Sequence, residues 1–240
     1  MIKRWFLLLP VMLLFSCIAD EDFDSPFDKI SDFNFENGLN GWKGGFANYS
    51  MLLADSFDLN VEHTQLPDPY QNEGKAIRLS ARNFNGELFM FLKNQVDGLK
   101  PNQAYRISYE FVFLPELINT YDQQNVENFP VVFKVGAFVG EPVSVPPVDE
   151  SMADETVDLN FQPGNYNQED GDLKVLGEFR FKDLNQEGIG QLSGFNSLNK
   201  VVNATSDGNG KLWLVIGMET NLEVEYSAYF NRIIVYYEEA

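Results

Sequence analysis

The amino-acid sequence predicts an all-β protein, an antiparallel β-sandwich or jelly roll. The 240 residues include 21 phenylalanines and 10 tyrosines, which supply most of the 14% aromatic content, and such residues favour strands over helices. Several segments alternate apolar and polar side chains with a period of two, whereas no long segment keeps the period of an amphipathic helix. Turn residues separate these segments, which is typical of many short antiparallel strands.

The start of the chain has the layout of a secretory signal peptide. Lys3 and Arg4 form a positively charged beginning, and an apolar run follows at residues 5–15. This run is too short to cross a bilayer core of about 30 Å as a helix, and Pro10 interrupts it. We therefore expect residues 1–16 to be a signal peptide rather than an anchor helix.

Cys17 is the only cysteine, so it has no partner for a disulfide within the chain. The stretch LFSC at residues 14–17 resembles the lipobox of bacterial lipoproteins, in which the cysteine carries fatty acyl chains such as palmitate and begins the mature protein. The alternative is an ordinary signal peptide whose cysteine stands there by chance. The resemblance implies lipidation of Cys17 and stable membrane anchoring through more than one acyl chain.

An acidic segment follows this cysteine. Acidic side chains, beginning with Asp20, Glu21 and Asp22, mark residues 17–30 as a lipidated, acidic tether. Acids this close to the cysteine resemble the export signal that sends some lipoproteins to the outer face of the outer membrane. This resemblance implies a Gram-negative-type bacterium and a lipid-anchored position at the cell surface.

Residues 31–240 are expected to form one β-sandwich domain, because no internal repeat and no interdomain linker interrupts them. The clearest strand is 104–113, where Tyr105, Ile107 and Tyr109 share one face and polar residues take the other. The other main strands follow from the same alternation or from apolar runs between turns, and they are 75–82, 86–96, 130–140, 173–181, 211–219 and 228–238.

Two long segments interrupt this rhythm of strands and turns, at residues 114–129 and 141–172. Loops of this length within a compact domain are usually functional or mobile. These two segments are therefore the first places to search for binding residues.

Three stretches resemble galactose-binding-like jelly rolls, a superfamily that contains many carbohydrate-binding modules. Residues 32–50 hold a strand, a Gly-rich turn and a Gly-Trp pair, residues 96–113 place a Gly-Leu-x-Pro turn before a strand headed by an aromatic residue, and residues 212–237 resemble the closing strand pair. The resemblance implies a galactose-binding-like fold and noncatalytic glycan binding. It also extends to bacterial lipoproteins of this layout with no assigned activity, and a fold alone does not fix function.

The charge balance excludes one class of partner. The chain has 17 basic and 36 acidic residues, a formal net charge of −19. Such a chain repels the phosphates of nucleic acids and the head groups of anionic lipids. We therefore expect no nucleic-acid partner, and a soluble body that stays dispersed or collects cations.

Catalytic motifs are sparse. His63 is the only histidine, which excludes a zinc site built from several histidines, and neither G-x-S-x-G nor the common nucleotide-binding glycine motifs occur. We interpret His63 as a loop or strand-end residue, with a catalytic role as the alternative. Paired carboxylates hydrolyse glycosides in many enzymes, but a chain this acidic brings such pairs together by chance.

Two sets of oxygen-bearing side chains are candidates for a structural calcium ion. Glu169, Asp170 and Asp172 surround a glycine, and closely spaced hard oxygens suit Ca²⁺. The alternative is a hydrated acidic loop. The resemblance to galactose-binding-like domains, which often hold one calcium near their first and last strands, separately nominates Glu36 and Asn231.

Loop aromatics flanked by polar residues are candidates for sugar binding, because an aromatic ring can pack on a sugar while its neighbours bind the hydroxyl groups. Tyr70, Tyr121 and Tyr166 fit this description, and Trp42 joins them although its strand pattern assigns it mainly to the core. The alternative is that each ring covers the core beneath its own loop. We expect an envelope-anchored lipoprotein that binds a glycan; the alternatives are a structural, assembly or adhesin subunit that binds another protein and, third, a glycoside-active enzyme.

Overall fold

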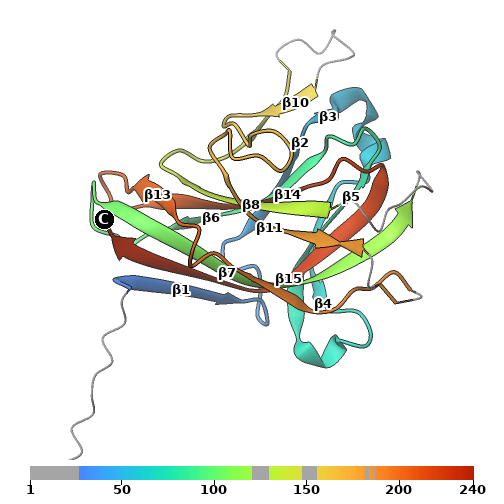
Figure 1. Cartoon of the computed structure of the whole chain (residues 1–240), viewed down its shortest axis with the longest axis horizontal. Helices are drawn as coiled ribbons and strands as arrows, with labels where there is room; N and C mark the ends of the chain where they lie inside the picture. Colours follow the sequence, from blue (N-terminus) through green and yellow to red (C-terminus); the bar gives the residue numbers. More distant parts are fainter. Residues whose placement is uncertain (1–26, 121–129, 148–155, 182–183, 186) are drawn as a thin grey trace, which may run out of the picture.

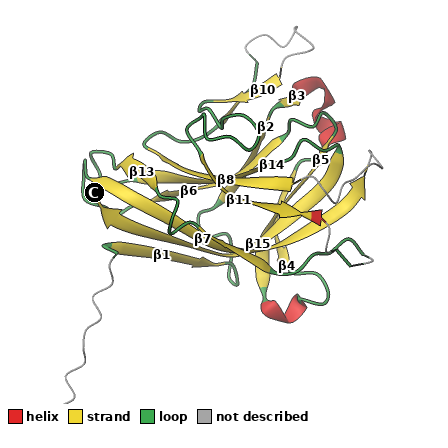
Figure 2. Ribbon diagram, viewed as in Figure 1, coloured by secondary structure: helices red, strands yellow, loops and turns green. Residues whose placement is uncertain are grey.

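The computed structural model describes residues 27–120, 130–147, 156–181, 184–185 and 187–240. In these residues two antiparallel sheets pack face to face as a β-sandwich (Figures 1 and 2). The predicted all-β fold class is therefore confirmed. The helices of the described chain are short 3₁₀ turns, which agrees with the expected low helix content.

The larger sheet, sheet A, has the strand order β12–β7–β15–β5–β4, and β1 also pairs with β15 and β13 with β7. Its strands are β1 (Lys29–Asn34), β4 (Asn60–Gln65), β5 (Lys75–Asn83), β7 (Ala104–Thr120), β12 (Ser193–Asn196), β13 (Val202–Thr205) and β15 (Val224–Glu239). The second sheet, sheet B, has the order β11–β8–β14–β6–β2. Its strands are β2 (Lys43–Ala47), β6 (Phe89–Val96), β8 (Pro130–Phe138), β11 (Lys174–Arg180) and β14 (Leu212–Glu219).

A small third sheet lies at one edge, beside β2, and is visible at the top of Figure 1. Its order is β3–β10–β9. Its strands are β3 (Tyr49–Ser50), β9 (Ser144–Val145) and β10 (Thr156–Leu159). The predicted loop 141–172 therefore contains two short strands. Outside the sheets, the described chain forms the 3₁₀ helices η1 (Met51–Phe57) and η2 (Gln71–Glu73).

The strands β7 and β15 form the spine of sheet A and pair along their whole lengths. The predicted strand 104–113 is correctly placed but too short, because β7 continues to Thr120 and takes in the first part of the predicted loop 114–129. The period-two signal disappears there for a packing reason. Leu114 is buried in one apolar cluster and Leu117 packs against another, so both faces of this stretch are apolar.

The main core lies between sheets A and B, and aromatic rings dominate it. Phe113 lies 4.7 Å from Phe133 and stacks on Phe195 at 5.4 Å, measured between ring centroids. Tyr109 is fully buried, and its hydroxyl donates a hydrogen bond to the carbonyl of Gly136 on sheet B. Burying one such side chain contributes about 1.5–3 kcal/mol to the free energy of folding, so these inward residues of β7 help to stabilise the packing of sheet A on sheet B.

The outer face of sheet B is not open to solvent along its whole length. Phe161 and Leu173, which flank the segment between β10 and β11, pack on Phe89, Phe91 and Val215 of the sheet and form a separate buried cluster. The apolar pair within an otherwise polar segment explains why this segment folds back onto the sheet. The segment leaves only part of this face available to a ligand.

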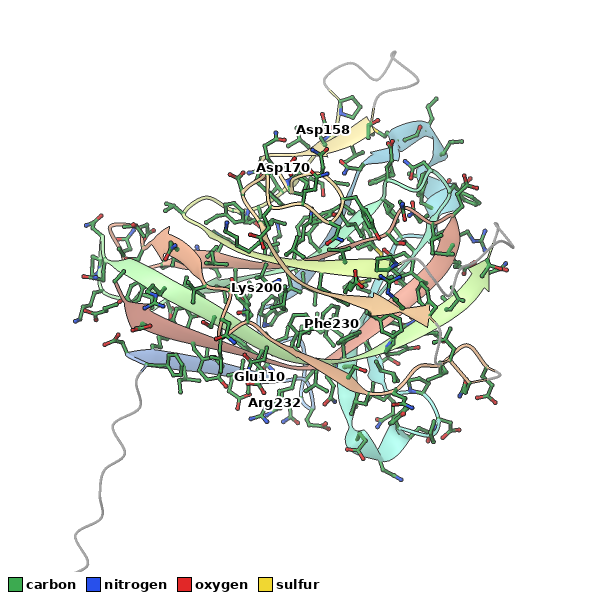
Figure 3. All side chains as sticks on the ribbon, in the orientation of Figure 1. Glu110, Asp158, Asp170, Lys200, Phe230 and Arg232 are labelled. Atoms are coloured by element: carbon green, nitrogen blue, oxygen red, sulfur yellow. The ribbon has the colours of Figure 1, made fainter. Side chains whose placement is uncertain are left out.

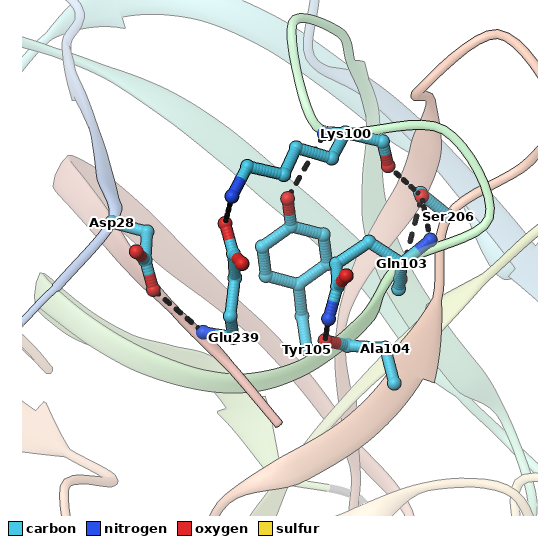
Figure 4. Close-up of polar contacts among 7 residues, drawn as sticks. All are labelled: Asp28, Lys100, Gln103, Ala104, Tyr105, Ser206 and Glu239. Carbon is cyan, nitrogen blue, oxygen red and sulfur yellow. Dashed lines mark hydrogen bonds and ion pairs between the residues drawn. The ribbon is translucent and has the colours of Figure 1, made fainter.

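The two ends of the described chain meet at one end of the sandwich (Figure 4). The Asp28 carboxylate accepts a hydrogen bond from the Glu239 amide at 2.7 Å, and the Glu239 carboxylate forms an ion pair with Lys100 at 2.6 Å. Strand β1 begins at Lys29, two residues before the expected start of the domain at 31. The predicted signal peptide, Cys17 and most of the tether lie outside the described residues.

No helix within the described ranges is long and apolar enough to cross a membrane.

Candidate functional site

A pocket opens at the end of the sandwich opposite to the two chain ends. It has a volume of 320 Å³, which is within the range of small-ligand sites. We call it the Tyr166 pocket, and its lining residues are Asn48, Gly86, Glu87, Asn165, Tyr166, Glu219 and Thr220. They come from the β2–β3, β5–β6 and β14–β15 connections, from the last residue of β14 and from the segment between β10 and β11.

A buried asparagine joins two of these connections. The Asn83 side-chain amide donates hydrogen bonds to the carbonyls of Thr220 and Leu222, at 2.8 and 2.9 Å, and its oxygen accepts one from the Leu88 amide. The β5–β6 turn is thereby tied to the β14–β15 turn. Gly86 has a φ of +68° and lies against the backbone of Asn221, so the turn needs glycine there.

A buried lysine holds the wall that carries Tyr166. Lys134 extends from β8 with a fully buried side chain, and its Nζ donates to the carbonyls of Pro163, Gly164 and Asn165 at 3.0, 3.3 and 2.8 Å. The same Nζ lies 2.7 Å from the Glu219 carboxylate of β14. One ammonium group therefore joins the wall of the pocket to its base.

The loop between β10 and β11 is also held by its own carboxylates. Asp170 accepts hydrogen bonds from the backbone and side-chain amides of Asn165, and Asp172 accepts one from the backbone amide of Gln162. These bonds lower the pKa of the Asp170 carboxyl, most strongly through the Asn165 backbone amide. The acidic residues thus stabilise the loop conformation that places Tyr166.

Tyr166 stands half-buried at the pocket wall. Its hydroxyl donates a hydrogen bond to the carbonyl of Pro130 at 2.7 Å, which fixes the ring. Burial, and then the charge of Glu219, raises the pKa of Tyr166 to about 12. A tyrosine with a fixed ring and an engaged hydroxyl offers its face, rather than its oxygen, to a ligand.

Glu219 lies at the base of the pocket, and the Tyr226 side chain lies behind it in the main core. Burial raises the pKa of the Glu219 carboxyl, and the ion pair with Lys134 opposes part of that rise. The Tyr226 hydroxyl is buried and has no hydrogen-bond partner in the described part of the chain. Burial raises the pKa of Tyr226, and the nearby Glu219 and Tyr166 raise it further. Buried groups of this kind bind ordered water or a ligand hydroxyl.

The structure separates the predicted sugar-binding aromatics. Tyr166 lines the pocket, whereas Tyr70 packs with Leu66 in a small apolar cluster beside η2. Trp42 is 1% exposed and meets Phe33 edge-to-face in the main core, so its ring has no face free for a ligand.

Tyr121 lies outside the described residues. His63 contacts the carbonyl of Phe35 through Nε2, and it lies inside β4 rather than in a loop or at a strand end as expected.

The predicted calcium ligands fall into two places. In the 167–173 loop, Glu169 pairs with Lys174 at 3.7 Å, and Asp170 and Asp172 bond to the loop itself as described above. Over the described ranges, no group of three or more histidine, cysteine or acidic residues is arranged to hold a metal ion.

The other two nominated ligands, Glu36 and Asn231, lie at one spot around the start of β5. Glu36 accepts a hydrogen bond from the Lys75 amide at 3.2 Å, and Asn231 donates to the carbonyls of Glu73 and Lys75. Gly74 lies directly against the Glu36 carboxylate, where a Cβ atom would stand 1.7 Å from its oxygen. Three separate segments therefore meet there: Glu36 and residues 73–75 contribute oxygen atoms, and Asn231 contributes an N–H donor.

Sequence reasoning missed most of the pocket. Lys134 and Glu219 carried a usable signal, because each is a charged residue inside an apolar strand and such residues are almost never fully buried unless paired. Asn48 and Glu87 carried none, since nothing in a turn sequence indicates which distant loop it will meet.

Comparisons with known proteins show no matching family model and no matching curated protein. Several solved structures match this chain over most of its length, and among them are three of similar size to it. A module specific for non-crystalline cellulose, CBM28, is 13% identical over 90% of this chain and 94% of its own, with a TM-score of 0.41. The mannan-recognising module TmCBM27 is 9% identical over 89% and 98%, with a TM-score of 0.39. The K1 adhesin domain of Lys-gingipain from Porphyromonas gingivalis W83 is 12% identical over 88% and 99%, with a TM-score of 0.38.

Other matching proteins are much longer than this chain. The enzymatically active domain of tailspike protein 4 of bacteriophage CBA120 is 10% identical with a TM-score of 0.36, and the match covers 86% of this chain but only 20% of the tailspike chain. A Clostridium thermocellum xylanase is matched over 28% of its length. Identities and TM-scores this low place the chain in no family.

Proposed function

We propose that this protein binds a glycan without catalysis, in the Tyr166 pocket. The observation that carries the proposal is the lining of the pocket: one fixed aromatic ring beside carboxylates, amides and a hydroxyl group. Sugars combine an apolar face with a ring of hydroxyl groups, and this lining matches both. A ring stacks on the sugar face, while carboxylates accept and amides donate hydrogen bonds.

The rigidity of the pocket supports binding. Its wall is attached to the sheet through Lys134, and its turns are joined through Asn83. A site that is already ordered loses less conformational entropy when a ligand arrives. The Glu219 carboxylate is held by Lys134 at 2.7 Å, so it is fixed in position to accept a hydrogen bond from a sugar hydroxyl group.

The position of the pocket suits an anchored protein. We propose that Cys17 is lipidated and that residues up to about 30 tether the domain to the outer membrane. The strand β6 runs from the pocket end to the end where the chain termini meet, and its eight residues correspond to about 25 Å. A domain tethered at its N-terminal end would therefore hold the pocket away from the membrane.

The first test is binding of the full chain to an array of plant, algal, fungal and bacterial glycans. Tyr166→Ala should remove binding to whichever glycan is recognised, whereas Tyr166→Phe keeps the ring and should retain most of the affinity. Tyr70→Ala is the matched control, because it removes a half-buried tyrosine that lies outside the pocket. Binding that survives Tyr166→Ala would contradict the proposed site, and turnover of a bound polysaccharide would favour the enzyme alternative.

A calcium ion at Glu36 stays part of the proposal. The Glu36 carboxylate and the carbonyls of Glu73 and Lys75 bring hard oxygen atoms to this region, and Ca²⁺ binds such atoms. For Ca²⁺ to bind there, the Asn231 side chain has to turn its oxygen toward the ion in place of the N–H group that it now donates to the two carbonyls. Calcium in 100-fold excess over its Kd would stabilise the fold by about 2.7 kcal/mol. The check is thermal unfolding with Ca²⁺ and with EDTA: Glu36→Ala should lose the difference, and Asp172→Ala should keep it.

A protein partner is the second candidate function. Met51, Leu52 and Leu53 stand 43%, 63% and 55% exposed on η1, close in sequence to the pocket residue Asn48. Consecutive exposed apolar residues often mark an interaction surface. Crosslinking in cells should recover a stable partner that the Leu52→Asp, Leu53→Asp double variant loses. Leu198→Asp, at a leucine elsewhere that is 48% exposed, should keep that partner.

A further inference from the structure

The charged side chains that line the Tyr166 pocket, among the described residues, are both carboxylates. Glu87 lies exposed at the rim and forms no ion pair with the described residues, and Glu219 lies at the base. None of the described residues that line the pocket is a lysine or an arginine. A ligand therefore meets two carboxylates at the pocket surface and no cation.

The nearest buried cation is not available to a ligand. Lys134 is completely buried, and its ammonium group contacts three backbone carbonyls as well as Glu219. An ammonium group has three hydrogens to donate, so four acceptors leave none for a further partner. Lys134 offsets part of the charge of Glu219 and contributes no binding group of its own.

The surroundings add to this negative field. Asp170, which is labelled in Figure 3, lies on the same loop as Tyr166, and its negative charge raises the pKa of Glu219. The negative charge of Glu178 raises the pKa of Tyr166 in the same way. Arg180 opposes the effect of Glu178, and the two side chains pair at 2.7 Å, so together they add no net charge beside Tyr166. The whole chain carries a net charge of −19, so long-range repulsion also disfavours the approach of anions.

We infer that the Tyr166 pocket selects sugar units without a negative charge and excludes uronic acids and sulfated sugars. This inference rests on the proposed glycan binding and names the class of glycan. Uncharged sugars place hydroxyl donors against the Glu87 and Glu219 carboxylates, and amino sugars add a favourable charge. A carboxylate or sulfate on the sugar would instead face like charges with no cation to bind it.

The experiment compares oligosaccharides that differ in charge alone. Cellohexaose and mannohexaose are the neutral probes, oligoglucuronate and oligomannuronate of the same length and linkage are their anionic counterparts, and glucosamine hexamer is the cationic probe. The full chain is titrated with each probe in a calorimeter at low and at high salt. We expect the anionic counterpart of any bound neutral probe to bind at least about fivefold more weakly, because one like charge within a few ångströms has at least that effect. This difference in affinity between the neutral and the anionic probe should become smaller at high salt.

Reversing one charge gives the sharper readout. Glu87→Lys changes an exposed turn residue and should bring the anionic probe close to its neutral counterpart. Glu187→Lys makes the same charge change at an exposed position outside the pocket. This control should leave the difference in affinity between the anionic and the neutral probe unchanged. An anionic probe that binds the unmodified chain as tightly as its neutral counterpart overturns the inference and leaves the proposed function standing. Failure of every glycan on the array and every probe to bind overturns the proposed function, and this inference with it.

Discussion

Two lysine–glutamate pairs hold opposite ends of the sandwich at nearly the same distance and in different surroundings. At the end where the chain termini meet, Lys100 and Glu239 lie 2.6 Å apart, and their side chains are 67% and 27% exposed. At the pocket end, Lys134 and Glu219 lie 2.7 Å apart, and their side chains are 0% and 10% exposed. Water surrounds the first pair and is almost excluded from the second.

The difference shows that distance alone does not rank an ion pair. An exposed pair exchanges water contacts for a screened attraction and adds little stability. A buried pair has lost its water, so removing one partner leaves an uncompensated charge. Lys134 also binds three carbonyls of the pocket wall. The buried pair therefore specifies where the wall lies, whereas the exposed pair only adds to contacts that strand pairing already makes.

The largest expected effect is at the buried pair. Lys134→Met removes the cation and leaves Glu219 and three carbonyls without their partner, so we expect a loss of about 3–5 kcal/mol in the free energy of unfolding. Denaturant unfolding of the full chain measures this loss. Adding Glu219→Met to the same chain should recover part of the lost stability, because two apolar side chains then replace the whole buried ion pair. A loss below about 1 kcal/mol, the value typical of exposed pairs, would contradict the distinction between the two ends.

The next effect tests whether burial also decides how much a neutral hydrogen-bonding side chain contributes to stability. Asn83 is fully buried and bridges two turns with three hydrogen bonds, so Asn83→Ala should cost about 1–3 kcal/mol. Asn85→Ala is the matched control, since Asn85 is exposed on the same turn and bonds the Asn48 carbonyl. Equal losses in the two variants, measured by thermal unfolding, would show that burial of the amide does not matter there.

The same contrast explains what the sequence could predict. The strands follow from local alternation, so 75–82 and 104–113 reappear within β5 and β7. Tyr166 was also predictable as a candidate, because a tyrosine among amides and acids in a long loop is a local pattern. Its role at the pocket wall was not, since it depends on Lys134, which lies 32 positions earlier in the sequence.

The features that local sequence patterns could not predict have equally specific causes. The stretch after residue 113 stays in β7 because both of its faces are covered, and a two-sided apolar strand has no alternation to detect. Glu36 and Asn231 came from a resemblance rather than from any pattern, and their convergence at the start of β5 requires the antiparallel pairing of β15 with β5. The pocket itself is made by turns, whose meeting is decided by the order of strands in the two sheets.

Titration of Glu219 sharpens the comparison further. Burial raises the pKa of Glu219 from its ordinary value of 4.5, so the folded protein holds this proton to higher pH than the unfolded chain does. Stability from this group is therefore present at acid pH and is lost as pH rises through the folded pKa. Unfolding free energies of the wild type, relative to Glu219→Gln, should fall as pH rises above 4.5. A relative rise would mean that the attraction of Lys134 outweighs burial.

The smallest expected effect is at the exposed pair. Lys100→Met removes an ion pair whose lysine is mostly in water, and strand β15 remains attached there through its pairing with β7 and through the bond between Asp28 and Glu239. Unfolding at physiological salt should not separate this variant from the wild type, because mobile ions screen exposed charges. At low salt a small loss of stability should emerge. A large loss that persists in high salt would show that this end depends on its ion pair as strongly as the pocket end does, and the ranking by burial would then be wrong for this protein.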